Sequence, residues 1–145
     1  MLTWIKGIFR PAEIIAGTAG ERGAAGERCA ADFLQHHHGY EIVTRNWHSP
    51  GDKRDEIDLV CRDGDVLVFV EVKTRPATAL VRGFLTVDRR KQQALRRAIH
   101  AYLGHLRTRP QTYRLDVVEV VTDPKAPPQV LVFQNVPLLP HGGHH

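Results

Sequence analysis

Runs of apolar and polar residues along the 145-residue chain predict two helices and five strands. Apolar positions recur every three or four residues in two long segments, which predicts amphipathic helices at 21–38 and 86–106. Shorter apolar or alternating runs, bounded by turn-forming residues, predict strands at 40–47, 55–61, 66–74, 113–121 and 129–136. The predicted order is therefore αβββαββ, which places the chain in the α/β class.

The spacing of these elements predicts one domain at residues 21–137. It is preceded by an N-terminal arm at 1–20 and followed by a flexible tail at 138–145. In the first helix, Ala30, Phe33, Leu34 and His37 share one face, and Gly39 fits the C′ position. In the second, Thr86 is a candidate N-cap, and the predicted buried stripe is Leu95, Ile99, Tyr102, Leu103 and Leu106.

A tight hairpin is expected between the second and third strands, because Asp63-Gly64 is a strong two-residue turn signal. Counting outward from a turn centred on this pair sets Glu56 opposite Glu71 and Asp58 opposite Phe69. A three-residue loop would shift the pairing by one and turn the acidic residues to the other face. The apolar pattern opposes that shift.

In the favoured register, Glu56, Asp58, Glu71 and Lys73 point to one face of the hairpin. The alternate residues point into the core, namely Ile57, Leu59, Val70 and Val72. Like charges that face each other on a sheet destabilise it. Three converging carboxylates therefore call for a cation.

Hard oxygen ligands of this kind suit Mg²⁺ or Mn²⁺. The backbone carbonyl of Val72 can add a ligand, and Lys73 places a fixed positive charge beside the ion. Such a site is equipped for phosphodiester hydrolysis, with the lysine positioning or deprotonating a water or stabilising charge on the phosphate. The alternative for Glu71 and Lys73 is a solvated strand end with an ordinary cross-strand ion pair.

Charge adds a second indication, because the formal net charge is +4 and the cations gather after the third strand. This excess permits nucleic acid as the partner without specifying it. The candidate nucleic-acid-binding residues are Arg75, Arg82, Arg89, Arg90, Lys91 and Gln92. A solvated helix face is the alternative for Lys91 and Gln92.

No stretch approaches the roughly 20 apolar residues of a membrane span, so no membrane association is expected. Cys29 and Cys61 lack a C-x-x-C spacing and read as reduced, buried thiols, which indicates a cytoplasmic protein. The run His36-His37-His38 does not read as a metal site, since consecutive helical residues point about 100° apart.

Four stretches resemble the YraN family, also called UPF0102: "GERCAADFLQHHHGYEIVTRNW", "DEIDLVCRDGDVLVFVEVKTR", "VDRRKQQALRRAIHAYL" and "YRLDVV". They cover most of residues 26–118. Asp58, followed after twelve residues by Glu71-Val72-Lys73, also resembles the motif of the PD-(D/E)xK nucleases. Where the family usually reads Gly-Glu-Ile-Asp, this chain has Asp55-Glu56-Ile57-Asp58.

The resemblance implies a restriction-endonuclease-like αβββαβ core, with a mixed central sheet flanked by helices. It also implies a distant relation to Holliday-junction resolvases and a metal-dependent endonuclease acting on DNA, including branched or repair intermediates. On that pattern Asp58 and Glu71 are metal ligands, Lys73 is the catalytic lysine and Glu27 is the helix acid that completes the site. Glu56 is a candidate second-metal ligand or a residue that lines the site.

Three functions stay open from the sequence. An endonuclease is favoured, because clustered acids would only repel DNA in a protein that merely binds it. The alternatives are a catalytically inactive nucleic-acid-binding module of the same fold, and a protein-interaction role. Junction resolution would need two active sites and hence a homodimer, which no sequence feature specifies.

Overall fold

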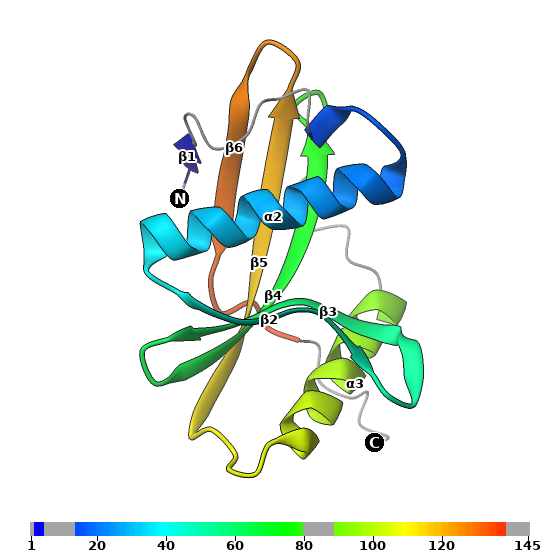
Figure 1. Ribbon diagram of the computed structural model, residues 1–145, viewed down its shortest axis with the longest axis vertical. Coiled ribbons are helices and arrows are strands. Elements are labelled where there is room, and N and C mark those ends of the chain that lie inside the picture. Colours follow the sequence, from blue (N-terminus) through cyan, green and yellow to red (C-terminus); the bar gives the residue numbers. More distant parts are fainter. Residues whose placement is uncertain (1, 5–13, 80–88, 139–145) are drawn as a thin grey trace.

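A six-stranded mixed sheet forms the centre of the fold (Figure 1). The computed structural model describes residues 2–4, 14–79 and 89–138. Its elements are β1 (Leu2–Trp4), α2 (Ala19–His38), β2 (Glu41–Ser49), β3 (Asp52–Asp63), β4 (Val66–Pro76), α3 (Arg89–His105), β5 (Thr112–Asp123) and β6 (Ala126–Phe133). The predicted αβββαβ core with its mixed sheet and flanking helices is confirmed, and the fold is restriction-endonuclease-like.

The strands lie in the order β1-β6-β5-β4-β3-β2. Strands β4 and β5 are parallel along their whole length, from Val66↔Thr112 to Pro76↔Thr122, and α3 makes the crossover between them. The other neighbouring strands pair in antiparallel fashion. A central parallel strand is buried on both faces, which explains why "VLVFV" in β4 is continuously apolar.

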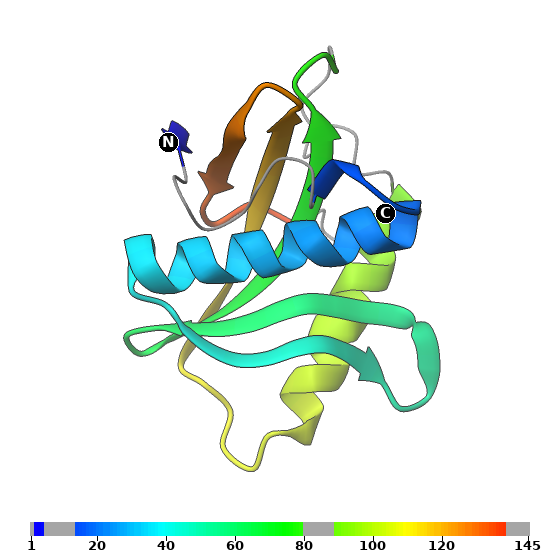
Figure 2. The same cartoon turned by 45° about the horizontal axis from the view of Figure 1, so that its top comes forward.

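Two hydrophobic clusters cover the two faces of the sheet. Leu59, Cys61, Val68 and Val70 pack in the cluster under α2. The residues that alternate with them, including Val60 and Phe69, pack in the cluster under α3. In Figures 1 and 2, α2 crosses one side of β4, β5 and β6, while α3 lies against the β2–β3 hairpin. The site residues of β4 therefore divide between two layers.

Capping interactions define both ends of α2. Thr18 caps its N-terminus in a reciprocal capping box with Glu21, and Gly39 closes the C-terminus in a left-handed conformation with φ 67°. The predicted face is buried except for His37, which is exposed and stacks on Phe33 with ring centroids 4.7 Å apart. Helix termini are polar places, so the last residue of the predicted stripe stays outside the core.

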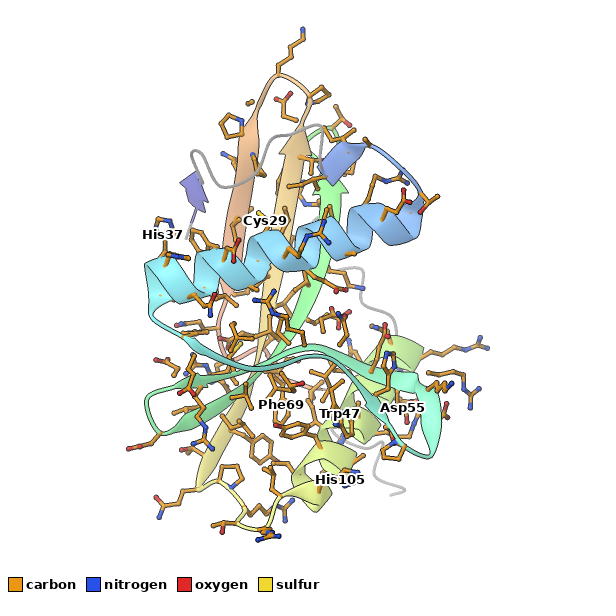
Figure 3. All side chains as sticks on the ribbon, viewed as in Figure 1. Cys29, His37, Trp47, Asp55, Phe69 and His105 are labelled. Atoms are coloured by element: carbon orange, nitrogen blue, oxygen red, sulfur yellow. The ribbon has the colours of Figure 1, made fainter. Side chains whose placement is uncertain are left out.

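The predicted stripe of the second helix is confirmed. Leu95, Ile99, Tyr102 and Leu103 are buried, and Leu106 packs half-buried against them. Trp47 of β2 meets Tyr102 edge to face at 5.3 Å, which attaches the hairpin to α3. Trp47, Phe69 and His105 all lie on this side of the sheet (Figure 3). The predicted helix start at Thr86 lies outside the described residues.

The N-terminal segment contributes to the domain at the positions that the structure describes. Leu2–Trp4 pairs with β6 as an edge strand, and Ile14 is fully buried under α2. The boundary that we predicted at residue 20 falls inside α2. Of the predicted tail, only Leu138 is described, and it packs half-buried on the α3 cluster. No helix in the described ranges is long and apolar enough to cross a membrane.

Candidate active site

Strands β3 and β4 separate at the point where the predicted carboxylates lie. The last pair in their ladder is Leu59↔Val70, so the next position along sets Asp58 beside Glu71. There the Val72 N–H donates to Asp58 Oδ2 at 2.8 Å in place of a backbone partner. Because the N–H and C=O of a strand residue point to the same edge, the Val72 carbonyl faces the same gap.

This register corrects our sequence prediction. The pair Asp63↔Val66 makes Gly64 and Asp65 the two loop residues, so every pairing moves by two positions. The neighbour of Glu71 is therefore Asp58, and our prediction that Glu56 lies opposite Glu71 is wrong. Glu56 instead pairs with His48 of β2, whose Nδ1 lies 3.7 Å from Glu56 Oε2.

Glu71 is the most enclosed acid of the group, with a side chain only 3% exposed. Its Oε1 lies 3.3 Å from Lys73 Nζ and 3.3 Å from Lys91 Nζ. Its Oε2 is buried and has no hydrogen-bond partner in the described part of the chain. A buried carboxylate oxygen without a partner is costly. This oxygen therefore has the character of a ligand atom.

Asp58 has an unusual proton affinity. Burial and then the nearby Glu71 carboxylate raise its pKa to about 8, although the Val72 hydrogen bond opposes the shift. Burial also raises the pKa of Glu27 on α2, and the charges of Glu56 and Glu71 act in the same direction. When two carboxyl groups crowd together, one of them keeps its proton to a higher pH, and a bound cation opposes this effect.

Glu27 reaches this group from the opposite layer. It hydrogen-bonds to Asp58 and to the side chain of Asn46. A hydrogen bond between two carboxyl groups needs a proton on one of them, and Asp58 with its raised pKa is the natural holder. The structure therefore brings the sequence-predicted Glu27, Asp58, Glu71 and Lys73 together.

Close packing at Gly26 makes the approach of Glu27 possible. Gly26 is buried, and a Cβ there would collide with the Thr74 Oγ1 and lie 3.2 Å from the Thr74 Cβ. Helix α2 thus touches β4 beside Lys73. An added methyl group would push the helix, and Glu27 with it, away from the strand.

Asn46 is a site residue that the sequence reasoning missed. It lies between the pairs Arg45↔Leu59 and Trp47↔Ile57, which sets it opposite Asp58. Its φ of 50° is left-handed, a conformation that Asn tolerates better than most residues. The available signal was an Asn in the middle of a strand, where Asn is depleted.

Lys91 has a larger role than the sequence suggested. Burial alone would lower its pKa, but attraction by Glu71 and Asp58 outweighs burial and raises it. Lys91 is therefore a charged member of the site contributed by the first turn of α3. This contact replaces the solvated helix face that was its alternative.

The other predicted cations have different positions. Arg75 is mostly buried, and its Nε lies 3.4 Å from Glu119 Oε2. Arg89 and Arg90 are exposed at the start of α3, and Gln92 is half-buried beside them. Arg82 lies outside the described residues. Asp55 is buried in a two-bond pair with Arg97, at 3.0 and 3.1 Å, and so anchors α3 on β3 away from the acids.

The donor set fits a magnesium-type ion. No three His, Cys, Asp or Glu side chains in the described ranges are arranged to hold a metal together. However, Mg²⁺ is commonly bound by one or two carboxylates together with substrate phosphate and water. Asp58, Glu71 and the Val72 carbonyl match that requirement, and the partnerless Glu71 Oε2 supplies a specific reason for a cation.

These features define a class of protein, an α/β domain of the restriction-endonuclease-like fold with an acid–lysine cluster where β3 and β4 separate. The model of the uncharacterised protein family UPF0102 matches residues 26–120. A UPF0102 protein of Symbiobacterium thermophilum is 42% identical over 113 residues, which cover 78% of this chain and 92% of the relative. The chain therefore belongs to the UPF0102 family.

Two further relatives support this assignment. A UPF0102 protein of Paenarthrobacter aurescens is 39% identical over 79% of this chain and 91% of the relative. Another, of Beutenbergia cavernae, is 43% identical over 68% of this chain and 80% of the relative. The match to the family model, over residues 26–120, includes all the acids and lysines that meet at the site.

Proposed function

We propose that this protein is a metal-dependent endonuclease that hydrolyses phosphodiester bonds in DNA. The observation that carries the proposal is the buried Glu71, whose Oε1 meets two lysines while its Oε2 has no partner within the described residues. Asp58 lies beside it with a pKa of about 8. A second buried acid would only destabilise a structural ion pair, because it adds a buried negative charge. A bound cation would offset both carboxylates.

Each side chain has a role in that chemistry. Asp58, Glu71 and the Val72 carbonyl would hold Mg²⁺ or Mn²⁺, which supplies a Lewis acid for phosphodiester hydrolysis when bound. Lys73 keeps a positive charge beside Glu71 and can orient a water or stabilise charge on the phosphate. Lys91 places a second positive charge against the same oxygen. Glu27, hydrogen-bonded to Asp58, can take up or return a proton.

The surroundings support DNA as the substrate. Arg89 and Arg90 are exposed in the same first turn of α3 that carries Lys91. Such cations can bind the phosphate backbone without reading sequence. Both cysteines are free and buried, which suits the cytoplasm, where we place the protein. Cutting both strands of a four-way junction would need two copies of the site.

Cleavage assays with matched variants test the proposal. Linear, single-stranded and four-way-junction DNA are incubated with the wild type in Mg²⁺ or Mn²⁺. We expect Glu71→Gln and Lys73→Ala to lower the cleavage rate by about a hundredfold or more, as loss of a group acting in the transition state does. Glu41→Gln and Lys125→Ala make the same chemical changes at exposed positions on β2 and in the β5–β6 turn. They should leave the rate unchanged.

Two results would sink the nuclease proposal. One is cleavage by Glu71→Gln or Lys73→Ala at the wild-type rate, which would identify a contaminating nuclease. The other is binding of these DNAs without cleavage under either metal, which would leave the non-catalytic binding module as the function.

A further inference from the structure

A pocket of about 540 Å³ opens directly beside the acid cluster. It lies between the first half of α2 and the end of β4, two segments that lie together in Figures 1 and 2. Glu27 and Val72 line the pocket and also belong to the candidate active site. A group that occupies this pocket would therefore be next to the reacting phosphate.

The pocket combines apolar and cationic walls. Ile15 and Pro76 form an apolar surface beside the buried Ile14, while Arg22 of α2 brings a guanidinium group. Flat apolar surfaces suit nucleobases, and guanidinium groups suit phosphate. Among the classes of ligand that unite these two features, a nucleotide is the one that the neighbouring acid–lysine cluster would process.

Arg22 is held in position and keeps donors to spare. Its Nη1 donates to the Gly17 carbonyl at 2.7 Å. A guanidinium carries five N–H donors, so Arg22 retains donors for a phosphate after making this structural bond. The guanidinium of Arg75 bonds to Glu119 at 3.4 Å on the face of the sheet opposite α2, and so takes no part in the pocket.

We propose that this pocket binds one unpaired nucleotide of the DNA substrate, adjacent to the phosphate that is cut. The inference rests on the proposed function and adds the substrate class, namely DNA with an unpaired nucleotide at the cleavage point. A base inside a duplex is stacked and paired and cannot enter a pocket in the protein. A base at a flap, gap or junction is already unpaired, so the cost of extruding it is least there.

The volume agrees with this occupant. Pockets for small ligands run from about 300 to 1,000 Å³, and about 540 Å³ is enough for a single nucleotide with some water.

Metal-free binding of thymidine 5′-monophosphate tests the pocket independently of cleavage. The full chain carries ¹³C-labelled isoleucine methyl groups and is titrated while their NMR signals are followed. We expect the signals of Ile14 and Ile15 to move and that of Ile99, buried under α3, to stay. Inorganic phosphate alone should bind more weakly, because it leaves the apolar wall uncovered.

A matched pair of arginine variants makes the test specific. Arg22→Ala should weaken mononucleotide binding by about tenfold, as loss of a charged hydrogen bond does. Arg28→Ala removes an exposed arginine of the same helix that does not line the pocket, and should bind like the wild type. Unmoved Ile14 and Ile15 signals, or equal losses in the two variants, would overturn the pocket proposal.

The same preparations separate this proposal from the nuclease proposal. Mononucleotide binding without any DNA cleavage would keep the pocket and refute the nuclease. Cleavage of fully paired duplex as fast as of flapped or gapped DNA would refute the unpaired-nucleotide requirement and leave the nuclease standing.

Discussion

At the scale of single residues, Asp58 combines three features of the site. It receives the Val72 N–H, hydrogen-bonds to Glu27 and faces the charge of Glu71. In this environment the pKa of the buried Asp58 carboxyl group is about 8, so a metal ion could displace its proton at physiological pH. Metal ligands must be deprotonated to bind, so occupation of the site and the charge of Asp58 are linked.

The raised pKa of Asp58 has a consequence for stability. An acid with a pKa of about 8 in the folded state and about 3.9 in the unfolded chain favours the folded state fully below pH 4. That contribution is lost as the pH rises through 8. Without metal, the unfolding free energy of the wild type should therefore fall from about pH 4 to pH 8 and level off above. The slope for one proton is at most about 1.4 kcal/mol per pH unit.

Urea denaturation at several pH values measures this slope. Asp58→Asn cannot titrate and should show a flatter profile, so the difference between the two proteins isolates Asp58 from the other groups. Added Mn²⁺ should stabilise the wild type more at pH 8.5 than at pH 6, and the variant much less at either pH. Parallel pH profiles for the wild type and Asp58→Asn would contradict the proton on Asp58.

At the scale of elements, the β3–β4 turn shows what a local pattern can and cannot predict. The sequence signal at Asp63 and Gly64 correctly predicted a two-residue hairpin loop and the face on which the acids lie. It did not predict the register, because Gly can hold either loop position. Gly64 takes the first, with φ 59°, as in a type II′ turn, and Asp65 has no positive φ. Shifting the β3–β4 pairing by two positions leaves each side chain on its predicted face of the hairpin but changes the residue that lies opposite it.

Other features depended on contacts between elements that no local pattern contains. Lys91 reaches Glu71 only because α3 packs back against β3, the neighbour of β4, and Asn46 meets Asp58 only through the β2–β3 pairing. Ile57 and Leu59 were expected to share one core layer. Instead Ile57 packs under α3 and Leu59 under α2. The pairing of β3 with β2 is regular from Glu56 to Val60, so the period-two pattern fails here without a bulge.

The contact between α2 and β4 gives a prediction at this scale. Gly26→Ala adds a methyl group against Thr74, and such overpacking costs about 1–3 kcal/mol. Gly23→Ala, in the same helix, meets nothing within 4 Å and should stabilise by about 0.5–1 kcal/mol. The two alanine variants should therefore shift the thermal midpoint in opposite directions.

A double variant decides whether the cause is the contact itself. Thr74→Ala removes Oγ1, the atom that the new methyl group would collide with, and leaves only the Cβ at 3.2 Å, so Gly26→Ala should cost much less in that background. An unchanged cost would mean that Gly26 is needed for another reason.

At the scale of the whole molecule, a buried polar network fastens the sheet on its α2 side. Asp116 of β5 is fully buried and accepts from Tyr40, which follows α2, from Arg114 and from the Asn135 backbone after β6. Arg114 also bonds to Asp63 at the end of β3 at 2.9 Å. The network thus joins segments far apart in sequence, and none of its members belongs to the acid–lysine cluster.

This separation predicts that stability and activity can be changed independently. Asp116→Ala leaves Arg114 without its buried partner, and removing one member of such a pair costs about 3–5 kcal/mol. Urea denaturation should therefore show a large loss, while Asp65→Ala, at an exposed turn position, should show little. At a temperature where Asp116→Ala is still folded, it should cut DNA at the wild-type rate.

Lys73→Ala should give the opposite pattern, since Lys73 is partly exposed at the site and anchors no other element. It should lose much less unfolding free energy than Asp116→Ala, because Lys91 Nζ remains 3.3 Å from the same Glu71 oxygen, while cleavage collapses. If Asp116→Ala remained folded and still lost as much cleavage activity as Lys73→Ala, the network would be coupled to the site. The buried network around Asp116 and the acid–lysine cluster would then not be independent of each other.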